Sequence, residues 1–219
     1  MKNFIPILKQ SRLFAGINED ELVAMLSCLQ ARKQAYRKGT YVLRQGDQVD
    51  TIMILAEGSL LIQRDDYWGN RTIISAVDQG DMFGEAYAAS NRCPMSNDVI
   101  AASDSTVIFF DVRKVLSTCS SSCPFHAMVV QNLFYTISEK NRQLVRKLGH
   151  LAKRTTREKL ISYLSEEADR QGSGTITIPF NRQQLADFLS VDRSAMSTEL
   201  GKMRDEGLIT FTKNRFTLL

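Results

Sequence analysis

The 219-residue chain has few histidines and no long run of apolar residues. Its longest apolar stretches, residues 52–55 and 107–110, are far too short for a membrane span, which needs about 20 residues. Only two histidines are present, His126 and His150, and neither lies between positions 39 and 111. A metal-dependent barrel enzyme needs several histidines and carboxylates on neighbouring strands. These absences argue against a membrane protein and against a metalloenzyme.

The sequence also lacks familiar catalytic motifs and an export signal. There is no G-x-S-x-G elbow, no glycine-rich phosphate loop with its lysine, and no cysteine–histidine pair at a persuasive spacing. The first residues show no basic segment followed by an apolar run and a small-residue cleavage site. We therefore predict a cytoplasmic protein that is not an enzyme, in which most of the four cysteines remain thiols.

What is present is an ordinary globular composition. Apolar residues make up 43% and charged residues 24% of the chain, and the formal net charge is +4. A chain of this length is typical of two modules, with room for a third element. The small basic excess permits an acidic partner but does not identify one.

The first half of the chain predicts a helical segment followed by a small β-barrel or roll. Asn18 and Glu21 form a capping-box pattern before a helix with one apolar stripe. Short β-rich runs then alternate with glycines that allow turns. The runs are residues 40–44, 51–56, 59–64, 72–77, 99–102 and 106–111. Many short strands separated by turns are typical of a barrel or roll.

From about Pro124 the apolar residues follow a helical period for nearly thirty residues. They recur at alternating spacings of four and three, as in a coiled-coil seam. The seam consists of Val130, Phe134, Ile137, Asn141, Leu144, Leu148 and Leu151. A buried asparagine such as Asn141 is best satisfied by its symmetry mate in a parallel dimer. We predict a dimerisation helix with Lys140 and Lys147 on its solvent-exposed faces; the alternative is a seam that packs on the chain's own roll.

Residues 180–207 predict a helix, a tight turn and a second helix. Asn181 caps the first helix and Asp192 caps the second. One face of the second helix is apolar. The opposite face has short polar side chains, with a single arginine at its N-terminal end. The residues of this outer face are Arg193, Ser194, Ser197 and Thr198. Such a face suits close approach to a major groove, with the arginine on a guanine edge.

The end of the chain completes a winged helix-turn-helix. After Gly207, two β-rich runs predict a hairpin whose basic tip contains Lys213 and Arg215. We predict that this domain binds DNA, and we place Arg182 and Gln183 at the same interface. The alternative, a helical hairpin packed against an apolar partner, requires large side chains on the outer face of the second helix.

Three segments together carry a resemblance to a known family. They are the glycine-punctuated roll with Gly-Asp-Met-Phe-Gly-Glu at 80–85, the long helix, and residues 180–197. In this order they resemble the Crp/Fnr superfamily of bacterial transcription regulators, over essentially the whole chain. The resemblance implies an α+β protein in three parts. They are a double-stranded β-helix, or β-roll, with N-terminal helices that senses an effector (1–118), a dimerisation helix (119–152) and a winged helix-turn-helix (153–219).

The resemblance also implies how these parts act. It implies a homodimer on near-palindromic double-stranded DNA, a small-molecule effector in the roll that gates DNA binding, and RNA polymerase as a partner if the protein is an activator. No membrane partner is implied. Arg193, Ser194 and Ser197 fall on base-contacting positions, whereas Thr198 stands where many members carry arginine.

The effector positions depart from those of cyclic-AMP-binding members. Those members hold the phosphate with a Gly-Glu pair and with an Arg-Ser or Arg-Thr pair ten residues further on. By this resemblance the effector pocket contains Gly84, Glu85, Met95, Ser96, Leu144 and Val145. The thioether of Met95 cannot neutralise a phosphate, and Arg92 is displaced from that position. We therefore expect an effector other than cyclic AMP, either uncharged or aromatic; a cyclic-nucleotide-responsive regulator is an alternative.

The cysteines provide another alternative. Cys119 and Cys123 have a C-x3-C spacing beside His126, which predicts a regulator that responds to thiol oxidation or to a metal. The simpler interpretation is that both are small buried apolar residues. Cys28 stands alone near the N-terminus, without the cysteine cluster of iron–sulfur members. We predict no metal or haem.

Overall fold

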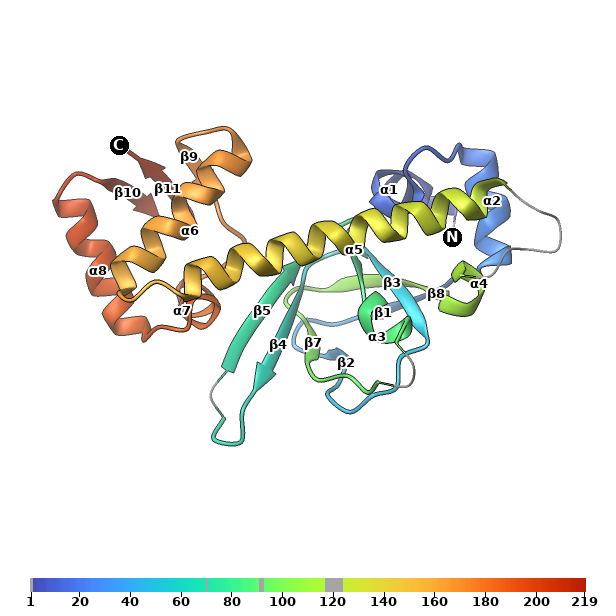
Figure 1. The fold of residues 1–219 in the computed structure, drawn as a ribbon, viewed down its shortest axis with the longest axis horizontal. Coiled ribbons are helices and arrows are strands. Elements are labelled where there is room, and N and C mark those ends of the chain that lie inside the picture. Colours follow the sequence, from blue (N-terminus) through green and yellow to red (C-terminus); the bar gives the residue numbers. More distant parts are fainter. Residues whose placement is uncertain (1, 70, 91–92, 117–123) are drawn as a thin grey trace. The chain divides into compact units, whose positions relative to one another are not determined.

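The computed structural model describes residues 2–69, 71–90, 93–116 and 124–219 (Figure 1). The chain divides into two compact units, one of residues 1–68 and 74–141 and one of residues 69–73 and 142–219. Along the chain, the strands of a roll are followed by a long helix and then by a C-terminal helical region with a small sheet. This arrangement confirms the predicted α+β fold class.

Short helices precede the roll. They are η1 (Lys2–Phe4), α1 (Ile5–Gln10), η2 (Arg12–Phe14) and α2 (Glu19–Cys28). The predicted capping box starts α2: the side chain of Asn18 accepts from the backbone N–H of Glu21, and the carboxylate of Glu21 accepts from that of Asn18, both at 2.9 Å. The box satisfies two backbone donors that a helix start otherwise leaves unpaired.

Two four-stranded sheets form the roll, in the orders β1-β8-β3-β6 and β2-β7-β4-β5. The strands are β1 (Arg32–Tyr36), β2 (Tyr41–Leu43), β3 (Thr51–Glu57), β4 (Leu60–Asp65), β5 (Arg71–Val77), β6 (Met82–Phe83), β7 (Asp98–Ala101) and β8 (Ser105–Asp111). Each predicted β-rich run corresponds to a strand. The sequence did not predict β1, because most of its side chains are exposed and show no apolar alternation.

The central strand β3 is buried on both faces. Ile52 and Ile54 lie in a core shared with the N-terminal helices, whereas Met53 and Leu55 point into a second core between the sheets. Successive side chains of a strand point to opposite faces, so burial of all four requires a layer on each side. Each large apolar side chain buried in this way stabilises the fold by about 1.5–3 kcal/mol.

Two short helices, α3 (Glu85–Ala88) and α4 (Val112–Leu116), complete the roll. Gly84 precedes α3 with φ of 80°, a left-handed conformation that favours glycine. A Cβ at this position would lie 2.2 Å from Cε of Met53. The positive φ therefore favours glycine where the chain enters α3, whereas the end of the flexible Met53 side chain could move aside.

The long helix α5 (Pro124–Leu151) has 28 residues and confirms the predicted long helix. Val129 and Leu133 are buried in the core with the N-terminal helices. The seam residues have a different environment: Phe134 and Leu148 are 68% and 64% exposed, and Asn141 is also exposed. The apolar seam is thus separate from the face of α5 that packs on the roll.

The prediction that Lys140 and Lys147 lie on solvent-exposed faces of this helix is wrong. Lys140 is half-buried and donates hydrogen bonds to the carboxylate of Glu85 and to the carbonyl of Met82. Lys147 is also half-buried, and its burial lowers its pKa to about 8. Long lysine side chains cross apolar surface to reach polar partners, which a helical pattern alone does not reveal.

The second unit contains a three-stranded sheet, in the order β10-β11-β9, and three helices after α5. The elements are α6 (Thr156–Gln171), β9 (Thr175–Thr177), α7 (Arg182–Leu189), α8 (Arg193–Asp205), β10 (Ile209–Thr212) and β11 (Arg215–Leu218). Asn181 caps α7 and Asp192 caps α8, as predicted. The rings of Tyr163, Phe180 and Phe188 pack together within this unit.

His150 joins the end of α5 to α6. Its Nδ1 lies 2.8 Å from Oγ of Ser162, and its Nε2 lies 3.1 Å from a carboxylate oxygen of Glu166. The side chain is buried, and desolvation lowers the pKa of His150 even though the Glu166 carboxylate acts in the opposite direction. The imidazole is therefore neutral in the folded protein at neutral pH.

We expect acidification to destabilise this joint. The unfolded chain binds a proton at His150 more readily than the folded one, so the free energy of unfolding falls as pH drops through the unfolded pKa of about 6.5. His150→Asn keeps a polar group beside Ser162 but does not titrate, and it should flatten the pH dependence of Tm between pH about 8 and about 5.5. Thermal unfolding followed by circular dichroism measures this, and a wild-type slope in the variant would contradict it.

Candidate DNA-binding surface and effector pocket

The helix α8 presents the predicted polar face. Arg193, Ser194, Ser197 and Thr198 are all exposed, whereas the apolar side of the helix, with Met196, Leu200 and Met203, is buried. This separation follows the helical period and places one long cation in the first turn, next to short hydroxyl side chains. Oγ of Ser197 donates to the carbonyl of Arg193 at 2.8 Å, so that hydroxyl must turn away from its own helix to reach a base.

Arg157, which the sequence did not suggest, connects α6 to α8 through hydrogen bonds. Arg157 of α6 donates from Nε to Glu199 at 2.5 Å and from its two Nη atoms to Glu206 at 2.9 and 2.7 Å. These bonds raise the pKa of the Arg157 guanidinium and lower that of the Glu206 carboxyl. The bidentate pair fixes direction as well as distance. Because its partners are 42 and 49 residues away, no local motif could have identified Arg157.

The predicted residues at the start of α7 have different environments. The guanidinium of Arg182 lies 4.5 Å from the ring centroid of Phe211 and 4.9 Å from that of Phe216. It is half-buried, and desolvation lowers its pKa. The stacking attaches α7 to the wing. Gln183 is exposed and donates to Asp187 at 2.8 Å.

The wing forms as predicted. Strands β10 and β11 pair antiparallel, with Thr212 opposite Arg215 across the turn. Lys213 has φ of 55°, and both Lys213 and Arg215 are exposed. The wing therefore exposes two cations near its tip, the type of group that contacts phosphates.

In the roll, the carboxylate of Glu85 already has a partner. The residue is 6% exposed, and its Oε1 lies 2.8 Å from Nζ of Lys140 on α5. Its Oε2 is buried and has no hydrogen-bond partner in the part of the chain that the structure describes. One oxygen is thus neutralised by the long helix, and the other is available to a donor.

Met95 belongs to the core of the roll. It is 4% exposed and packs in the same cluster as Phe83 and Val99. The carbonyl of Met95 accepts a hydrogen bond from the N–H of Gly46 at 2.8 Å. The N–H of Met95 donates to the carbonyl of Asp47 at 2.9 Å. A side chain placed here fills the space between the sheets, so it contributes packing and no charge.

The other predicted effector residues belong to different units. Oγ of Ser96 lies 2.6 Å from the hydroxyl of Tyr87 on α3, which joins the Met95-Ser96 segment to the Gly84-Glu85 segment. Leu144 and Val145 are 49% and 59% exposed and belong to the second unit. Arg92, Cys119 and Cys123 lie outside the described residues.

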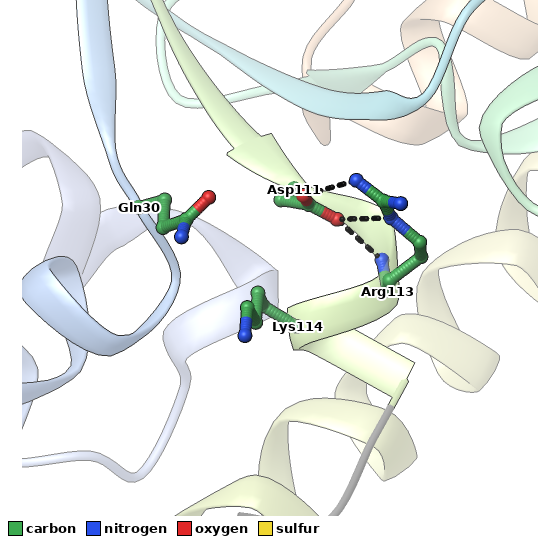
Figure 2. Close-up of a pocket in the computed structure, with 4 residues that line it drawn as sticks. All are labelled: Gln30, Asp111, Arg113 and Lys114. Atoms are coloured by element: carbon green, nitrogen blue, oxygen red, sulfur yellow. Dashed lines mark hydrogen bonds and ion pairs between the residues drawn. The ribbon is translucent and has the colours of Figure 1, made fainter.

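A shallow hollow on the first unit contains none of the predicted site residues. Figure 2 shows its lining, Gln30, Asp111, Arg113 and Lys114. The guanidinium of Arg113 donates to the carboxylate of Asp111 at 3.3 and 3.1 Å, and Asp111 lowers the net positive charge there. This hollow is therefore a poor anion site.

The described ranges contain neither a metal-ligand cluster nor a helix fit to span a membrane. No group of three or more histidine, cysteine, aspartate or glutamate residues lies close enough together there to hold a metal ion. Within the same ranges, none of the helices combines the length and apolar character that a membrane span needs.

The comparisons with known proteins agree with this geometry. Residues 33–122 match the family model of the cyclic nucleotide-binding domain, and residues 158–219 match that of the Crp-like helix-turn-helix domain. The chain is 26% identical over 199 residues to the probable transcriptional regulator flp of Lacticaseibacillus casei, covering 90% of this chain and 86% of that protein. It is also 27% identical over 105 residues to human cGMP-dependent protein kinase 2, covering 48% of this chain but only 14% of the kinase.

A solved structure gives the same result for the fold. The c-di-GMP responsive global regulator CLP of Xanthomonas campestris has a TM-score of 0.72 at 16% identity, with 89% of this chain and 97% of that one covered. The two family models cover the roll and the winged helix in the order that the Crp/Fnr resemblance requires. The chain therefore belongs to the Crp/Fnr family of DNA-binding transcription regulators.

Proposed function

We propose that the protein is a homodimer that binds a near-palindromic DNA site, and that a small effector other than cyclic AMP, bound in the roll, controls this binding. The observation that carries the proposal is the exposed polar face of α8, which begins with Arg193 at the N-terminal end of the helix. A major groove admits a helix with short side chains, and an arginine at its N-terminal end reaches guanine O6 and N7.

The exposed seam of α5 supports the homodimer. Phe134 and Leu148 expose more than half of their surface in a single chain, although such side chains are usually buried. A second copy is the partner whose apolar seam matches this one, and it also brings an Asn141 to pair with Asn141. A two-fold dimer carries two recognition helices and therefore prefers an inverted repeat, with half-sites about one helical turn apart.

The roll supports an effector without a phosphate. The cation that the structure pairs with Glu85 is Lys140, whose Nζ is already bound to that carboxylate. Met95 occupies the position where the resemblance places arginine, and it is buried among apolar side chains. A ligand with a hydroxyl or amide donor suits the unpaired Oε2 of Glu85. CLP is named as responsive to c-di-GMP, and for this chain we propose a different effector class.

Selection from a pool of random duplexes tests the proposed function. The full-length protein is incubated with the pool at low salt, and bound duplexes are amplified and sequenced, without effector and with a panel of small uncharged and aromatic molecules. We expect enrichment of one inverted repeat that depends on one of these molecules. Enrichment of no sequence under any condition would overturn the proposal.

The effector class leads to a prediction for cyclic AMP. Because its phosphate would lack a cationic partner, at a cost of several kcal/mol, we expect a Kd weaker than about 1 mM. Isothermal titration calorimetry measures this, and adenosine, which has the same base without the phosphate, is the control and should bind no more weakly than cyclic AMP. Saturable binding of cyclic AMP in the micromolar range would contradict the prediction.

A further inference from the structure

Two residues that are 98 positions apart meet in the first unit. Cys28 ends α2, and His126 lies in the first turn of α5; Sγ of the one is 3.8 Å from Nε2 of the other. The helices α2 and α5 share the core that contains Leu22 and Val129. No sequence motif indicates a partner for Cys28, because only the packing of these helices brings the imidazole to it.

The two side chains differ in their access to solvent. Cys28 is a free and exposed cysteine, whereas His126 is 3% exposed. Nδ1 of His126 is buried and has no partner among the described residues. The imidazole is thus held inside the core, and its Nε2 faces a thiol that small reagents can reach.

A purely structural role does not explain this histidine well. A buried polar nitrogen without a partner costs about 1–3 kcal/mol, a cost that an apolar side chain in the same place avoids. A thiol beside a fixed imidazole, in contrast, is the arrangement that activates cysteine as a nucleophile, because the imidazole accepts the thiol proton.

We propose that Cys28 is a peroxide-reactive thiol activated by His126. His126 takes the thiol proton, and the sulfur attacks one oxygen of hydrogen peroxide. An S–O bond forms and the O–O bond breaks; the leaving hydroxide takes the proton from His126 and becomes water. The sulfur is oxidised by two electrons to sulfenic acid, and the peroxide is reduced.

The chain contains an internal control for this chemistry. Cys93 is also free and exposed, but its sulfur lies 3.7 Å from the carbonyl oxygen of Pro94, and within the described residues no contact of its sulfur with an imidazole is found. The full-length protein is treated with hydrogen peroxide at neutral pH, sulfenic acid is trapped with dimedone, and the labelled peptides are quantified by mass spectrometry over time. We expect Cys28 to be labelled at least about tenfold faster than Cys93. Equal rates would overturn the proposal.

Two variants separate chemistry from packing. His126→Asn removes the base and should bring the labelling rate of Cys28 down to that of Cys93, with Cys93 unchanged. Val129→Ala loosens the same core but leaves the imidazole in place, and it should keep the fast rate at Cys28. The proposal is wrong if the two variants change Cys28 equally. If His126→Asn does not fold, as judged by circular dichroism, the rate ratio of Cys28 to Cys93 in the wild type and in Val129→Ala decides alone.

Discussion

Replacing Arg193 with alanine is expected to weaken binding to the selected DNA site by about 10- to 100-fold, since a bidentate arginine–guanine contact is worth about 1–3 kcal/mol. Arg193 is the only cation on the outer face of the first turn of α8. Its neighbours on that face are short, so no adjacent side chain replaces it. Fluorescence anisotropy with a labelled duplex, at one fixed salt concentration, measures the loss.

The matched control is Lys202→Ala. Lys202 is an exposed cation on the same helix, nine residues further along and therefore about half a turn round from Arg193. Its removal changes the charge of the domain by the same amount, and we expect less than about a threefold loss. A guanine contact also predicts that Arg193→Ala tolerates substitution of one base pair in each half-site, whereas the control does not. Equal losses in both variants would mean that Arg193 contributes only general charge.

The local features of both units could be predicted because their determinants lie close together in sequence. The caps of α2 and α7 each pair a residue with another three positions away, and the polar face of α8 follows from the helical period. Long-range contacts left no such signal. Arg157 meets Glu206 across 49 residues and Lys140 meets Glu85 across 55.

The pocket was harder to predict than the DNA-binding surface for a related physical reason. A recognition surface consists of neighbours on one helix, whereas an effector pocket collects residues from distant segments. The resemblance placed Met95 in the pocket, and the structure shows where its side chain lies, between the two sheets of the roll. Which cation meets Glu85 depended on the packing of α5 against α3, and the spacing of residues in the sequence does not encode that packing.

Replacing Phe134 with glutamate is expected to dissociate the proposed dimer. Phe134 is 68% exposed in the single chain and lies on the seam of α5. In the dimer, two copies lose about 1.5–3 kcal/mol of apolar burial each and two carboxylates face each other. We expect the dimer dissociation constant to rise by at least about 100-fold. Analytical ultracentrifugation over a concentration series measures this.

Tyr135→Glu is the control for this substitution. Tyr135 is the adjacent residue, 60% exposed, and lies off the seam, where its hydroxyl accepts a hydrogen bond from Gln131. It introduces the same charge on the same helix, and it should leave the dimer intact. A Phe134→Glu protein that remains dimeric would show that the seam is not the interface. If the Phe134→Glu protein is monomeric, we expect it to bind a duplex with both half-sites about as weakly as a duplex with one half-site. Two recognition helices bind more tightly than one only while the dimer links them.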